Sequence, residues 1–117
     1  MTLHQPGEFE ILVKAIQTKI RARRYRLTDH AEREREADQI TIREIEEALL
    51  SSRCELIENY PDDPRGASCL LLGFTDLGRP IHAVCGLTLS DVIVMITVYR
   101  PDPDQWIDWR ERRRKEP

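Results

Sequence analysis

The spacing of apolar residues near the N-terminus is typical of an amphipathic helix. Apolar side chains recur at intervals of i, i+3, i+4, i+7 and i+11, at Phe9, Leu12, Val13, Ile16 and Ile20. A helix with this period presents one apolar face to a core and leaves its basic face in solvent. The pattern therefore predicts a helix over residues 8–22.

Two shorter helices are predicted after a brief β-like alternation at "YRLT". The first follows a capping residue, which is either Thr28 or Asp29. The second follows Thr41, which forms a clearer capping box with Glu44 and precedes a single apolar stripe. We expect this second helix over residues 41–51.

From Cys54 onward the period of the pattern changes to two. Four runs alternate as strands do, namely "CELIENY", "SCLLLGFTD", "PIHAVCGL" and "DVIVMITVY". Their connections are short, whereas parallel neighbours need crossovers of a dozen or more residues. The pattern therefore predicts four antiparallel strands over residues 54–99.

The C-terminal segment starts with "PDPDQW" and ends with the basic run "RERRRKE". Prolines are tolerated at a helix start, and Trp106 and Trp109 have the i, i+3 spacing of a docking face. These features predict a basic helical tail over residues 103–117. The expected fold class is α+β: one domain over residues 1–117, in which residues 26–99 form a helix pair and the sheet. N-terminal helices would pack on a four-stranded antiparallel sheet, followed by the helical tail.

Composition limits the class of protein. Charged residues make up 33% of the 117 residues, and no apolar run approaches the roughly 18 residues that span a bilayer. The start "MTLHQPGEFE" has no basic and apolar segments of a secretion signal, so we expect a cytoplasmic protein with no membrane partner. The three cysteines are far apart, with no histidine at metal-ligand spacing. We expect reduced core thiols and neither metal nor cofactor.

Charge is distributed unevenly along the chain. The first 28 residues hold six basic and two acidic side chains, whereas residues 29–99 hold six basic and fourteen acidic ones. The basic cluster at Arg23, Arg24 and Arg26 is a candidate nucleic-acid-binding surface. On charge alone we favour the simpler alternative of a solubilising helix face.

Several short motifs, in a fixed order, resemble the bacterial domain-of-unknown-function family 4258. They are H-A-x-x-R in the first short helix, E-I-E-E-A-L in the next, the tyrosine and prolines after the first strand, G-R-P-I-H in the third strand and T-V-Y in the last. The resemblance covers about residues 26–109. That family is similar in layout to the RelE and BrnT toxins, whose fold class groups many small ribonucleases. The resemblance therefore implies a RelE/BrnT-like fold and, by analogy, a toxin-like ribonuclease.

The residues for such chemistry are present. Metal-independent RNA cleavage needs a base for the 2′-hydroxyl proton, an acid for the leaving 5′-oxygen, and cations for the phosphorane charge. On the predicted helix, His30 and Arg33 share one face at i, i+3. On the sheet, His82 is expected across from Thr97, with Tyr99 close by, if the connecting loop has two or four residues. These five residues form the predicted catalytic set, with RNA as the substrate.

Structural alternatives remain open for each candidate. His30 beside a helix cap is also consistent with a hydrogen bond to a carboxylate, and His82 with a satisfied core histidine. Thr97, Tyr99 and Tyr60 are good strand formers without any catalytic role. The alternative function is a non-catalytic module of the same fold that binds an antitoxin-like protein partner. The acidic middle of the chain counts against strong RNA binding.

Overall fold

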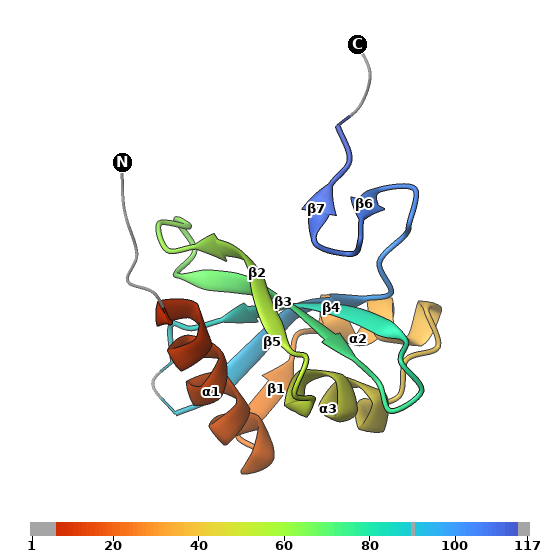
Figure 1. The fold of residues 1–117 in the computed structure, drawn as a ribbon. Helices are drawn as coiled ribbons and strands as arrows, with labels where there is room; N and C mark the ends of the chain where they lie inside the picture. The colour runs from red at the N-terminus through yellow and green to blue at the C-terminus, as the bar shows by residue number, and fades with distance from the viewer. Residues whose placement is uncertain (1–6, 90, 115–117) are drawn as a thin grey trace.

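The computed structural model describes residues 7–89 and 91–114, and these form three helices, a five-stranded sheet and a small hairpin (Figure 1). The elements are α1 (Glu8–Arg21), β1 (Tyr25–Leu27), α2 (Asp29–Ala37), α3 (Ile42–Leu50), β2 (Glu55–Tyr60), β3 (Ser68–Phe74), β4 (Pro80–Gly86), β5 (Ile93–Tyr99), β6 (Trp106–Ile107) and β7 (Glu111–Arg112). None of the described helices combines the length and the apolar character needed to cross a membrane.

The sheet has the strand order β1-β5-β4-β3-β2. The four strands from β2 to β5 pair antiparallel in sequence order, as their short connections predicted. The prediction of a four-stranded antiparallel sheet is nevertheless wrong, because β1 adds a fifth strand parallel to β5, with Tyr25 opposite Ile93 and Leu27 opposite Met95. The β-like alternation at "YRLT" falls on this strand, but nothing nearby in the sequence indicates its partner, which lies far along the chain.

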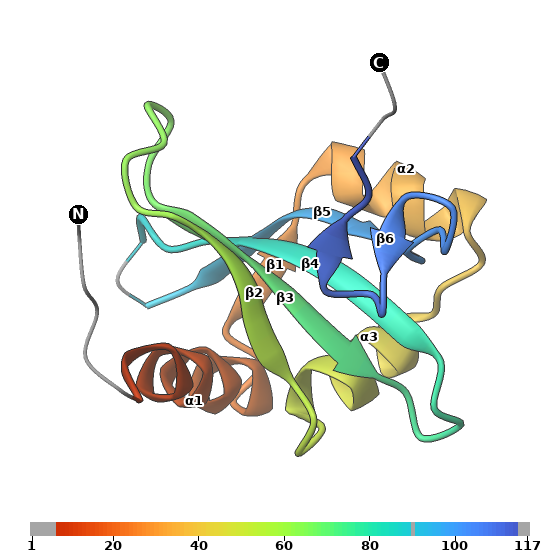
Figure 2. The same cartoon turned by 45° about the horizontal axis from the view of Figure 1, so that its top comes forward.

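Helices α1 and α3 cover one face of the sheet, which we call the inner face (Figures 1 and 2). The predicted apolar stripes supply the buried residues of both helices, Val13, Ile16, Ile20, Ile45, Ala48 and Leu49. The sheet contributes alternate residues to the same core, including Cys69, Leu71, Ala83, Cys85, Met95 and Val98. The opposite, outer face of the sheet therefore carries the other half of each strand's side chains.

Helix caps fix where the two short helices begin. Thr28, one of the two residues considered, caps α2 by accepting a hydrogen bond from the backbone N–H of Ala31 at 3.1 Å. The predicted capping box of Thr41 and Glu44 is present at the start of α3. These caps set the position of His30 in the first turn of α2.

Helix α2 lies along the edge of β5, beyond the short strand β1. The Thr28 hydroxyl donates to the carbonyl of Ile96 at 3.1 Å. The Glu34 carboxylate accepts from the backbone N–H of Val98 at 3.0 Å, and the Asp38 carboxylate accepts from that of Arg100 at 2.9 Å. Side chains of α2 thus satisfy backbone groups that a further strand would otherwise pair with, and they hold the helix beside the outer face.

The C-terminal segment is a hairpin, so the predicted helical tail over residues 103–117 is wrong; residues 115–117 lie outside the described residues. Strands β6 and β7 pair antiparallel and lie over the outer face (Figure 2). The chain reverses at Asp108 and Trp109, whose φ angles of 50° and 63° are left-handed and end any helix there. We call residues 101–114 the C-terminal hairpin.

The three cysteines are free thiols. Cys69 and Cys85 are fully buried in the core, as expected, and Cys54 is half-buried against it. Burial raises the pKa of Cys69 to about 12, so this thiol stays protonated at neutral pH.

Candidate functional site

The outer face carries three rows of side chains that cross the antiparallel strands. The first row is Glu55, Leu72, His82 and Tyr99; the second is Glu58, Leu70, Val84 and Thr97; the third is Tyr60, Ser68 and Gly86. Neighbouring rows are two residues apart along β3, β4 and β5, or roughly 7 Å. On β2 the first two rows are three residues apart, because a register shift lies between Leu56 and Glu58. The rows place residues from different strands on one continuous surface.

The register differs from the one predicted for His82. His82 is directly opposite Tyr99, and Thr97 is opposite Val84, one row away. A register shift follows Val84, and the connection between β4 and β5 spans residues 87–92. The prediction that His82 pairs with Thr97 is therefore wrong, although the three residues do share the outer face.

The first row is closed. His82 has no solvent exposure, with Nε2 2.8 Å from the carbonyl oxygen of Trp109 and Nδ1 3.0 Å from the hydroxyl of Tyr99. A carbonyl only accepts, so Nε2 carries the proton and Nδ1 accepts from Tyr99. Burial lowers the pKa of His82 and raises that of Tyr99 to about 12. Both side chains are held neutral in this environment.

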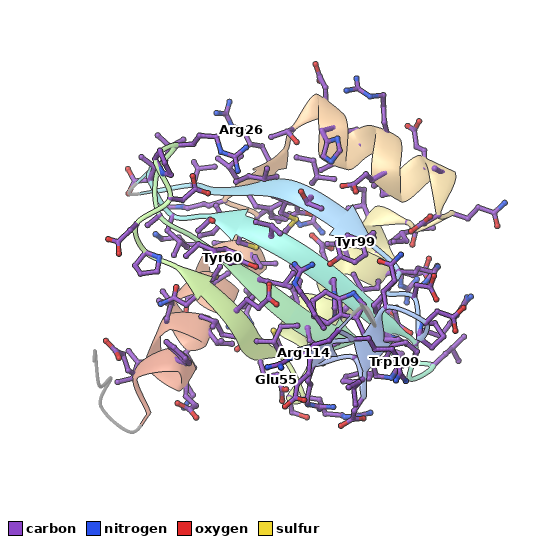
Figure 3. The ribbon with its side chains drawn as sticks, turned by 90° about the horizontal axis from the view of Figure 1, so that it is seen from above. Arg26, Glu55, Tyr60, Tyr99, Trp109 and Arg114 are labelled. Atoms are coloured by element: carbon purple, nitrogen blue, oxygen red, sulfur yellow. The ribbon has the colours of Figure 1, made fainter. Side chains whose placement is uncertain are left out.

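The C-terminal hairpin provides the cover over that row. Arg110 donates from Nε to Glu55 at 2.5 Å, and Arg112 donates to both carboxylate oxygens of Glu58 at 2.9 and 3.1 Å. The ring of Trp106 meets that of His82 edge-on, with 4.5 Å between centroids. Figure 3 shows Trp109 and Tyr99 toward the same end of the sheet, away from Tyr60.

An open pocket lies beside this covered row. Its volume is about 630 Å³, and its lining residues are Thr28, His30, Tyr60, Asp63, Arg65, Ser68, Val84, Ile96 and Thr97. We call it the His30 pocket. It joins the start of α2, the end of β2, the loop after β2, the start of β3, and the middle of β4 and β5, so its residues come from several strands of the outer face.

His30 is the accessible histidine of this pocket, with 60% of its side chain exposed. Its Nε2 lies 3.2 Å from Oε1 of Glu34. The same oxygen accepts the backbone N–H of Val98, so the carboxylate beside His30 is fixed to the sheet. The arrangement leaves His30 free to exchange protons with a ligand while one side of its ring is oriented.

Tyr60 and Arg65 supply a proton donor and a cation. The Tyr60 hydroxyl donates to Glu58, and burial and this carboxylate raise the pKa of Tyr60. Burial alone would raise the pKa of Glu58, but hydrogen bonds from Arg112 and Tyr60 outweigh it and lower that pKa. Arg65 is 85% exposed and only loosely paired with Asp63, at 3.4 Å. Its guanidinium can therefore turn toward an anion.

The predicted site residues separate into groups. His30 and Thr97 line one pocket, whereas His82 and Tyr99 lie together beneath the hairpin. Arg33 is exposed on α2 and does not line the His30 pocket.

The predicted nucleic-acid-binding residues are all exposed. Arg23 and Arg24 lie between α1 and β1, and Arg26 lies on β1. Figure 3 shows Arg26 toward the same end of the sheet as Tyr60, away from Trp109. Arg26 therefore lies toward the end of the sheet where Tyr60 lines the His30 pocket.

The predicted site residues did not include Tyr60 and Arg65, which line the His30 pocket, or Glu58, which accepts from Tyr60. The available signal was the segment "YPDDPRG", in which a single arginine follows a tyrosine. Register was needed to use it, because only the pairing of Tyr60 with Ser68 places the end of β2 beside the pocket.

Within residues 7–89 and 91–114, no three His, Cys, Asp or Glu side chains are grouped so that they could hold a metal ion. Chemistry without metal or cofactor stays a prediction.

Comparison with known proteins gives one match. No curated protein and no solved structure matches the chain, so the resemblance to RelE and BrnT toxins has no support from these comparisons. The family model of a domain of unknown function, DUF4258, matches residues 27–100. The match spans α2, α3 and the four antiparallel strands, and it ends just before the C-terminal hairpin. Because it covers more than half of the chain, the protein belongs to the DUF4258 family.

Proposed function

We propose that the protein cleaves RNA in the His30 pocket by general acid–base chemistry. The observation that carries this proposal is the convergence of His30, Tyr60 and Arg65, from three separate elements, on one open concavity. Cleavage of a phosphodiester needs a base, an acid and a cation within reach of the same group. The pocket offers one candidate for each role.

In the proposed reaction, neutral His30 takes the proton of the 2′-hydroxyl. The 2′-oxygen attacks phosphorus, the bond to the 5′-oxygen breaks, and Tyr60 gives its proton to that leaving oxygen. The products are a 2′,3′-cyclic phosphate and a 5′-hydroxyl end, and solvent then restores both side chains. Arg65 neutralises charge on the phosphoryl oxygens, and the hydroxyl of Thr97 is a further donor.

Cleavage of a 5′-labelled single-stranded RNA tests the proposal. His30→Ala should reduce the rate by about 100-fold or more, the usual contribution of a general base, and Arg65→Ala should reduce it through loss of the cation. Arg33→Ala is the matched control, because Arg33 is on the same helix as His30 but does not line the pocket. The same sequence made of DNA should not be cut. Full activity of His30→Ala, or equal cleavage of the DNA, would refute this mechanism.

Binding of a partner strand is a second candidate function. β2 is the outermost strand at the sheet edge opposite β1, and a groove of about 560 Å³ runs between it and α1. Apolar side chains of Val13 and Leu56 are among its lining residues. An extended segment of an antitoxin-like protein could pair with this edge. Protection of β2 amides from hydrogen exchange by the protein encoded beside its gene would support this function.

A further inference from the structure

The C-terminal hairpin is attached to the sheet by buried contacts of Trp106 and Trp109 with His82, and by two ion pairs nearer the surface. In the pair of Arg110 and Glu55 the side chains are 34% and 42% exposed, and in the pair of Arg112 and Glu58 they are 64% and 22% exposed. Ion pairs with this exposure are screened by water and salt and contribute little to stability. The strands of the hairpin are only two residues long, so they add few hydrogen bonds of their own.

The turn of the hairpin is also strained. Asp108 and Trp109 both have left-handed φ angles, although neither is glycine. Such a conformation persists only where its surroundings hold it. The hydrogen bond from Nε2 of His82 to the carbonyl of Trp109 ties this turn to the sheet. Within the hairpin, Arg110 also holds the turn by donating to the carbonyl and the carboxylate of Asp108. Loss of the His82 bond would remove a direct hydrogen bond between the turn and the sheet.

The residues beneath the hairpin continue the His30 pocket. His82 and Tyr99 in the first row are each two residues from Val84 and Thr97, which line the pocket in the second row. The distance between the rows is roughly 7 Å. Departure of the hairpin would therefore enlarge the existing pocket instead of opening a separate one.

We propose that the C-terminal hairpin is a reversible cover, and that its release joins His82 and Tyr99 to the His30 pocket as one continuous site. The last five residues of the hairpin, 110–114, hold four arginines and one glutamate, so this end of the released segment is basic and can bind RNA phosphates. In the closed state, Arg110 and Arg112 are paired with Glu55 and Glu58. The use of RNA rests on the proposed function, whereas the opening itself does not.

Chemical modification of histidine measures the opening in the full-length protein. Diethyl pyrocarbonate should modify exposed His30 quickly and buried His82 slowly, and mass spectrometry of peptides separates the two. The double variant Arg110→Ala with Arg112→Ala should raise the His82 rate by about tenfold, the effect of losing two exposed ion pairs. Arg114→Ala is the matched control on the same hairpin and should leave that rate unchanged.

Hydrogen exchange distinguishes local release from global unfolding. The amide of Arg113, which bonds to the carbonyl of Gln105, should exchange much faster than amides of β3, and rising salt should speed it further. If the double variant does not fold, this measurement on the wild-type protein decides the question. Modification of His82 no faster than β3 amides exchange would overturn the cover.

The two proposals fail in different ways. If His82 becomes reactive in the double variant and RNA cleavage rises with it, the result supports both. If His82 becomes reactive but neither protein cuts RNA, the cover stands and the proposed function fails. If His82 stays protected, the cover is wrong whatever the RNA assay gives.

Discussion

Two histidines on the outer side of the molecule differ in almost every property except their chemistry. His30 is 60% exposed and meets one carboxylate, whereas His82 has no exposure and uses both ring nitrogens in hydrogen bonds. His30 lies in the first turn of a helix at the sheet edge, and His82 lies in the middle of the sheet under the C-terminal hairpin. Whether a histidine can react is therefore decided more by the segment that covers it than by the face of the sheet on which it lies.

Removal of each histidine should give the largest contrast. His82→Ala leaves the Trp109 carbonyl and the Tyr99 hydroxyl without their partner and creates a cavity, so we expect a loss of about 2–4 kcal/mol in the free energy of unfolding. His30→Ala removes an exposed side chain and should change it by no more than about 0.5 kcal/mol. Urea denaturation of both variants measures the difference. Equal losses would remove the distinction between an open and a closed histidine.

Glu34 tests how firmly the open histidine is placed. Glu34→Ala leaves the N–H of Val98 without its acceptor and should cost about 1–2 kcal/mol in unfolding free energy. Glu34→Gln keeps a carbonyl oxygen for that bond and should cost less, while changing the contact with His30. Glu36→Ala, on an exposed position of the same helix, is the control. If alanine and glutamine at 34 had equal effects, the backbone bond would not be what holds α2.

The closed histidine should also make stability depend on pH. Burial lowers the pKa of His82 below the ordinary histidine value of about 6.5, so the unfolded chain takes up a proton before the folded one does. Stability is therefore complete above about pH 6.5 and falls as pH decreases toward the folded pKa, with a slope of at most about 1.4 kcal/mol per pH unit. The bond to Trp109 and the charge of Glu58 oppose this shift, and Arg112 adds to it.

A glutamine variant isolates that effect. His82→Gln can keep a donor toward Trp109 but has no proton to gain, so the difference in unfolding free energy between wild type and variant should change between about pH 7 and pH 5. The measurement is denaturation at several pH values. A difference that stays constant over this range would show that His82 does not titrate on unfolding.

The sequence predicted the parts of the fold that depend on local pattern. Helices α1 and α3 follow apolar stripes, and the capping box at Thr41 is readable from two residues. The alternation at "YRLT" was recognised, but it did not place β1 in the sheet, because its partner β5 lies far along the chain. The C-terminal hairpin was not predicted, because the prolines and the two tryptophans fit the start of a helix equally well. The turn at Asp108 and Trp109 is left-handed but contains no glycine, so its sequence does not indicate a hairpin turn.

The candidate site was predicted only in part for a similar reason. Residue type identified His30, Thr97, His82 and Tyr99 as a set on one side of the sheet. Which of them share a pocket depends on register, on a bulge after Val84, and on a hairpin that covers two of the four. None of these features has a signature in the residues themselves, because each depends on contacts between distant segments.

The parallel pair of β1 and β5 has a consequence for how the chain acquires its structure during synthesis. Tyr25 emerges from the ribosome long before Ile93, its neighbour in the finished sheet. Helix α2 depends on the same late strand for its bonds to Val98 and Arg100. The elements β1 and α2 therefore cannot complete their contacts until β5 has been made. Contacts this distant in sequence slow folding. The surface around His30 is complete only after β5 has been synthesised, so a product truncated before β5 would lack it.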